Sequence, residues 1–177
     1  EFQINKGINA LVVMGTTGEN ATIEYDEQHK IVRFVVEKVA GRVPVIAGTG
    51  TNNTEHVIHN TKAACEAGAD AVLVVTPYYN KATQNGLIAH FTAVADASTV
   101  PVILYNVPGR TGCNLLPKTV AKLAEHPNIA AIKEAGLTDV KVIVGGCPVT
   151  EEAAKAMGAD RKQIEHLINE IFKGVED

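Results

Sequence analysis

Tryptophan is absent from this sequence of 177 residues, cysteine occurs three times, and aromatic residues make up only 5% of it. Cys65, Cys113 and Cys147 are odd in number and lack the spacing of a metal site, so we expect reduced thiols in a cytoplasmic protein. No apolar run approaches the roughly 20 residues of a membrane span. We therefore expect no membrane partner.

Positive charge is also in short supply, with 16 lysines and arginines against 20 aspartates and glutamates. The net charge is −4 and there is no basic block, so a nucleic-acid backbone is not an expected partner. The six histidines are spread over predicted helices and loops and form no ligand cluster. We expect neither a metal nor a cofactor.

Apolar runs rich in valine and isoleucine are what the sequence does contain, at 9–15, 43–48, 71–75, 100–107 and 140–146. Continuous apolar runs are typical of strands buried on both faces, as in parallel sheets. Helical patterns lie between them, and alternating strands and helices predict consecutive βα units. We expect residues 1–177 to form a single α/β domain around a parallel sheet of about five strands.

The predicted helices are located by their caps and apolar spacing. The first follows Asp26 and Glu27 and has an apolar stripe of Ile31, Phe34, Val35 and Val39. The others are a helix capped by Asn53 or Thr54 that ends at Gly68, one over 85–98, one beginning near Pro117, one over 150–158 and a last one carrying the stripe 164–171.

The stretch IAAIKEA, residues 129–135, has two possible structures. As a strand it matches the regular spacing of the other strands, but only a few residues then separate it from the run at 140–146, too few for a parallel crossover. As a helix it would begin after Asn128 and end before Gly136. The alanines favour the helix, so local physics leans slightly towards it.

Four motifs connect the chain to a known family: GTTGEN (15–20), TPYYN (76–80), YNVPGRTG (105–112) and AIKEA (131–135). Their order and spacing resemble those of the dihydrodipicolinate synthases, which belong to the class I aldolases together with N-acetylneuraminate lyase. The resemblance covers residues 1 to about 135. It implies a (β/α)₈ barrel in which a strand-end lysine forms a Schiff base with pyruvate.

Carried over by motif, the resemblance makes Lys133 the reactive amine. It implies that Tyr105 relays protons together with Thr17 and a tyrosine from a second subunit, which matches Tyr79. Thr16 and Thr17 would bind the pyruvate carboxylate, and Arg110 would hold the aldehyde substrate. Apolar surroundings keep part of a lysine amine neutral and nucleophilic, and a nearby phenol and hydroxyls can pass the protons that imine formation requires.

The resemblance to this family stops after residue 135. The following sequence, GLTDVKVIVGGCPVTEEAAKAMGAD (136–160), resembles corrinoid-binding, flavodoxin-like domains. The loop that would supply a cobalt-ligating histidine is missing, so cobalamin is not expected. The letters IKEAG suit the end of a strand in one family and the end of a helix in the other. We therefore expect an engineered or spliced chain, an aldolase-derived fragment over 1–135 joined to a flavodoxin-like tail over 136–177.

Two hypotheses for fold and function follow. In the first, the chain is a scaffold with a flavodoxin-like doubly wound sheet and no native activity. In the second, it is a truncated class I aldolase, a partial and unclosed TIM barrel, in which Lys133 forms a Schiff base with pyruvate. Gly-rich loops after the strands could also hold a small anion. An exposed sheet edge could additionally pair two copies into a homo-oligomer.

Overall fold

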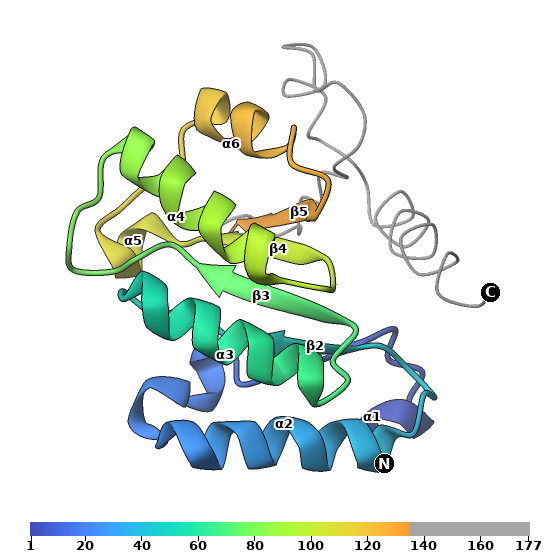
Figure 1. The fold of residues 1–177 in the computed structure, drawn as a ribbon. Coiled ribbons are helices and arrows are strands. Elements are labelled where there is room, and N and C mark those ends of the chain that lie inside the picture. Colours follow the sequence, from blue (N-terminus) through green and yellow to red (C-terminus); the bar gives the residue numbers. More distant parts are fainter. Residues whose placement is uncertain (135–177) are drawn as a thin grey trace.

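The computed structural model describes residues 1–134, which form one parallel five-stranded sheet connected by helices (Figure 1). The strands are β1 (Leu11–Val13), β2 (Val45–Gly48), β3 (Ala71–Val75), β4 (Val102–Asn106) and β5 (Ile129–Glu134). The α-helices are α1 (Phe2–Asn5), α2 (Tyr25–Val39), α3 (Thr54–Glu66), α4 (Gln84–Ala97), α5 (Pro108–Thr111) and α6 (Pro117–Leu123). Two 3₁₀ helices, η1 (Thr16–Gly18) and η2 (Asn20–Thr22), follow β1. No helix within residues 1–134 is long and apolar enough to cross a membrane.

The order of the strands in the sheet is β1-β2-β3-β4-β5, and every neighbouring pair is parallel. Five parallel strands in consecutive βα units are thus confirmed. A flavodoxin-like sheet reverses its strand order, with β1 between β2 and β3. The observed order has no reversal, so it corresponds to the second predicted arrangement, an unclosed part of a barrel.

The larger helices gather on one face of the sheet, where α2, α3, α4 and α6 pack side by side in chain order (Figure 1). This follows from the strand order, because right-handed crossovers that always step in the same direction place every helix on the same side. The main core lies between these helices and the sheet, where Val57, Leu87, Phe91, Val94 and Leu104 are almost fully buried.

The start of α3 follows one of its two predicted caps. The Asn53 side chain accepts hydrogen bonds from the backbone N–H groups of Glu55 and His56, at 3.0 and 3.3 Å, so the predicted cap of α3 is confirmed. One part of the predicted stripe on α2 is wrong. Phe34 is 63% exposed, whereas Val32 is buried, because the face that packs on the sheet is rotated by part of a turn from the predicted one.

The preference for a helix over 129–135 is also wrong, since residues Ile129–Glu134 form β5. The backbone of β5 pairs with β4 from Val102 to Asn106, and both of its isoleucines are buried. Asn128, the predicted helix cap, instead donates its side-chain amide to the carbonyls of Ala95 and Ser98 at the end of α4. Sheet pairing and burial outweigh the helix propensity of three alanines, which is worth less than about 1 kcal/mol per residue.

A register irregularity explains why this strand resembles a helix in sequence. Val102 pairs with Ile129 but the next residue, Ile103, pairs with Ala131, so Ala130 is an extra residue in the ladder. The shift lets Ile129 and Ile132 both face the core, although they are three residues apart. Apolar residues at that spacing are typical of a helix.

The strand predicted at 140–146 and the helices predicted over 150–158 and 164–171 lie outside the described residues. The fifth strand of the sheet is β5, at 129–134.

Candidate functional site

The central feature of the site is the contact between Lys133 and Tyr105. These residues lie directly opposite each other on β5 and β4, and neighbouring residues at the same register point to the same face of a sheet. The Lys133 Nζ lies 4.3 Å from the centroid of the Tyr105 ring. An ammonium group over an aromatic face is attracted by the ring's quadrupole. Strand pairing therefore brings together the two residues that the sequence predicts as amine and proton relay.

The wall around this pair is apolar. Leu73, Val75, Tyr105 and Val107 form a second buried cluster, with Ile46, Tyr78 and Ile103 packed against it. These residues come from the strands and the segments that follow them, on the face opposite the large helices. In a barrel this face is the interior, and the carboxyl ends of its strands carry the catalytic residues. Lys133 and Tyr105 lie near these carboxyl ends, at the last but one residue of β5 and of β4.

Thr16 and Thr17 lie at the other side of the sheet, in η1 directly after β1, so β2 and β3 separate them from Tyr105. The turn that leads to them begins at Met14, whose φ is 57°. Gly48 allows this turn to approach β2, because a Cβ on Gly48 would lie 2.1 Å from the Met14 carbonyl oxygen. Both threonines are exposed.

A cavity of about 300 Å³ opens beside Thr16, whereas Thr17 does not line it. Thr16, Gln28, Thr51 and Tyr78 contribute to its lining, which reaches the carboxyl ends of β2 and β3 and the N-terminus of α2. Neither Lys133 nor Tyr105 lines it. Gln28 is fixed by donating its amide to the carbonyls of Asn20 and Ile23, each at 2.8 Å.

Tyr79 and Arg110 project from loops after β3 and β4. Tyr79 has a left-handed backbone, with φ of 70°, and 87% of the residue is exposed. Its N–H donates to the carbonyl of Thr111 at 3.2 Å, which ties its loop to the segment that carries Arg110. Arg110 is exposed near the end of α5. Tyr79 and Arg110 therefore share one loop region.

Two residues of the site were not singled out from the sequence, Asn106 and Glu134. Each follows a predicted site residue, and they lie opposite each other in the ladder. The Asn106 Nδ2 donates to the Glu134 Oε1 and to the Asn114 Oδ1, both at 2.8 Å. The Asn106 Oδ1 accepts from the N–H of Leu115 at 3.1 Å. Their signal in the sequence was their place inside the motifs YNVPGRTG and AIKEA.

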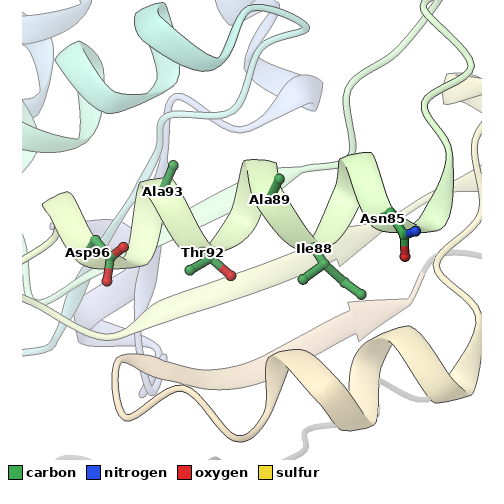
Figure 2. A pocket seen from close by; sticks show the side chains of 6 residues that line it. All are labelled: Asn85, Ile88, Ala89, Thr92, Ala93 and Asp96. Atoms are coloured by element: carbon green, nitrogen blue, oxygen red, sulfur yellow. The ribbon is translucent and has the colours of Figure 1, made fainter.

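A second hollow, of about 510 Å³, lies away from the strand ends. Figure 2 shows that the residues lining it, Asn85, Ile88, Ala89, Thr92, Ala93 and Asp96, follow one another along one side of α4. Within residues 1–134, no group of three or more histidine, cysteine, aspartate or glutamate side chains could hold a metal ion. The strand ends around Lys133 are therefore the best candidate for a reactive site in the described part.

Comparison with known proteins places the chain in a family. The sequence model of the dihydrodipicolinate synthetase family matches residues 1–167. The chain belongs to this family. The motif resemblance over residues 1–135 predicted this membership correctly.

Two similar relatives are 4-hydroxy-tetrahydrodipicolinate synthases. The 4-hydroxy-tetrahydrodipicolinate synthase of Geobacter sulfurreducens is 62% identical over 135 residues, which are 76% of this chain and 47% of that protein. That of Acetivibrio thermocellus is 56% identical over 149 residues, 84% of this chain and 51% of that protein. The chain therefore spans about half the length of the curated relatives it matches.

A solved structure shows the same fold. The chloride-inhibited dihydrodipicolinate synthase of Acinetobacter baumannii, complexed with pyruvate, is 50% identical and superposes with a TM-score of 0.75. The match covers 76% of this chain and 46% of that one.

The predicted splice is wrong. The match to the family model continues to residue 167, across the supposed joint at residue 135. The alignment with the Acetivibrio thermocellus relative covers 149 residues, more than the 135 of the supposed first fragment. Nothing in these matches indicates a corrinoid-binding tail. The main functional prediction, a scaffold assembled from two unrelated fragments, is overturned by the same matches. The short stretch VKVIVGG was too small a basis for a second family.

Proposed function

We propose that the chain forms a Schiff base between the Lys133 amine and pyruvate. The observation that carries this proposal is the placement of Lys133 against Tyr105, on neighbouring strands within an apolar wall. The amine attacks the keto carbon, and loss of water from the resulting carbinolamine gives the imine. Each step moves a proton between nitrogen and oxygen, so a hydroxyl close to the amine accelerates it.

Tyr105 is the proton relay in this proposal. Only 9% of the residue is exposed, and its ring already contacts the Lys133 side chain. A phenol held beside the amine can give a proton to the carbinolamine oxygen as water leaves and take one back afterwards. Thr17 would pass the proton onwards.

Thr16 and Thr17 would hold the pyruvate carboxylate. Both begin η1, and the first N–H groups of a helix have no acceptor within that helix, so they are free to bind an anion. In the described sheet β1 and β4 are separated by two strands. Curvature towards a closed barrel would turn the faces of these strands towards each other.

For the whole protein we propose the reaction class that the family resemblance implies, in which the imine of pyruvate joins an aldehyde. Arg110 would bind that second substrate, and Tyr79 would complete the proton relay of another copy of the chain. The high exposure of Tyr79 supports this role, because an inter-subunit residue must project outwards. We also propose that residues 1–177 are one α/β domain, as the unbroken family match to residue 167 suggests.

Borohydride trapping tests the proposed amine. The chain is incubated with pyruvate and sodium borohydride, which delivers hydride to the imine carbon and leaves a stable secondary amine. Intact mass and peptide mapping then locate the adduct, which adds the mass of pyruvic acid less one oxygen atom. We expect one adduct, on Lys133, and none in Lys133→Ala.

Lys118→Ala is the matched control, because Lys118 is an exposed lysine on α6. This variant should trap pyruvate as fast as the unmodified chain. Labelling spread evenly over surface lysines, at a rate unchanged by Lys133→Ala, would contradict the proposal.

A further inference from the structure

We propose that Asn106 is the positioning residue for Lys133, and that it acts by holding the carboxylate of Glu134. The inference rests on the proposed function of Lys133 and adds the contact that orients its amine. Asn106 ends β4 and Glu134 ends β5, so the two side chains connect the strands one residue beyond the Tyr105–Lys133 pair.

The Asn106 side chain is a buried branching point. Only 2% of the residue is exposed, and both ends of its amide are in use. The nitrogen donates to Glu134 and to Asn114, and the oxygen accepts from the N–H of Leu115. One amide thus joins the end of β5 to the segment that follows α5. Leaving this amide buried without partners would cost more free energy than its hydrogen bonds contribute when they are made. The bonded arrangement is therefore strongly favoured.

The position of this bond matters because successive residues of a strand point to opposite faces. Asn106 and Glu134 fasten the two strand ends on one face, while Tyr105 and Lys133 meet on the other. Ala130 interrupts the ladder earlier in β5, so the regular pairing that holds Lys133 extends only from Ala131 to Glu134. The Asn106–Glu134 bond closes that short stretch at its carboxyl end.

A pair of substitutions isolates the bond. Asn106→Asp has almost the same shape and keeps an oxygen for the Leu115 N–H, but it sets a second carboxylate against Glu134. The double variant Asn106→Asp with Glu134→Gln restores a donor and an acceptor with their direction reversed. Asn114→Ala is the matched control, since it removes the other partner of the Asn106 nitrogen and leaves Glu134 in place.

The first readout is the rate of pyruvate trapping on Lys133 in the full 177-residue chain. We expect Asn106→Asp to lower it at least about tenfold, because displacement of a reacting group by about 1 Å is costly. The double variant should recover most of the loss, and Asn114→Ala should stay within about twofold of the unmodified chain. A role of Asn106 that does not act through Glu134 would not be rescued by a change at residue 134.

The second readout does not depend on chemistry. The Tyr105 ring current should shift the NMR signals of the Lys133 ε-methylene protons upfield, because the Nζ lies over the ring. This shift should disappear in Asn106→Asp and return in the double variant. Glu134→Ala breaks the same bond from the half-buried side, so it provides the same test if Asn106→Asp does not fold.

The two readouts separate failure of this inference from failure of the proposed function. A chain that traps no pyruvate on Lys133, yet shows the ring-current shift and its loss and rescue, would refute the Schiff base and uphold the positioning role. If the variants Asn106→Asp and Glu134→Ala both trap pyruvate at the normal rate and keep the ring-current shift, the positioning role alone is overturned.

Discussion

His90 is a buried titratable side chain. It lies in α4 with 5% exposure, its Nδ1 is 2.9 Å from the Thr54 Oγ1, and its Nε2 has no partner within the described residues. Burial away from water lowers the pKa of His90 from its ordinary value of 6.5 to about 4. The imidazole is therefore neutral in the folded protein at pH 7.

We expect acid to destabilise the fold through His90. Between about pH 6.5 and pH 4 the unfolded chain binds a proton at this position and the folded chain does not. The free energy of unfolding should thus fall as the pH is lowered through that window, by on the order of 3 kcal/mol in total. Urea unfolding at several pH values measures the slope.

His90→Gln removes the titrating group and is the test of this assignment. The variant should show a smaller loss of stability between pH 6.5 and 4 than the unmodified chain. An equal loss in both would show that other groups cause the acid sensitivity.

Individual site residues could be predicted from the sequence only through their motifs. The family resemblance put Lys133 and Tyr105 at strand ends, whereas the local pattern around Lys133 favoured a helix. The partnership of Asn106 with Glu134 could not be predicted, because the two residues lie 28 positions apart along the chain and meet only through the register of β4 and β5.

Among the elements, α3 depends visibly on its first residue. Asn53 satisfies two backbone N–H groups that would otherwise lack an acceptor. We expect Asn53→Ala to lower the free energy of unfolding by about 1 kcal/mol, as is usual for loss of a helix cap. Chemical denaturation measures this difference.

The adjacent residue supplies the control for the cap. Asn52 contributes its backbone carbonyl, which accepts from the Asn80 side chain, and a substitution leaves that carbonyl in place. Asn52→Ala should change the stability by no more than about 0.5 kcal/mol. If both variants lost the same free energy of unfolding, Asn53 would not stabilise the fold by capping α3.

Most elements could be predicted because their signals are local. Asn53 and Pro117 mark the starts of α3 and α6, and uninterrupted valine and isoleucine runs mark β2, β3 and β4. β5 was harder because its signal is not local. Its alanines favour a helix, its extra residue Ala130 gives the isoleucines a helical spacing, and only pairing with β4 makes the strand.

For the whole molecule, the order of the strands determined which predicted fold was adopted. A flavodoxin-like sheet and an open barrel have the same βα sequence pattern, and they differ in whether the chain reverses direction across the sheet. No single residue encodes that choice. Here every crossover steps the same way, which places α2, α3, α4 and α6 on one face of the sheet.

The measurement that tests this account most directly is a crystal structure of the 177-residue chain after trapping with pyruvate and borohydride. The account predicts electron density continuous from the Lys133 Nζ into the pyruvyl group, with residues 129–134 in a strand and the Tyr105 hydroxyl beside the new bond. The pyruvyl carboxylate should point towards Thr16 and Thr17. Density on a different lysine, or a helix over residues 129–134 that carries Lys133 away from Tyr105, would contradict it.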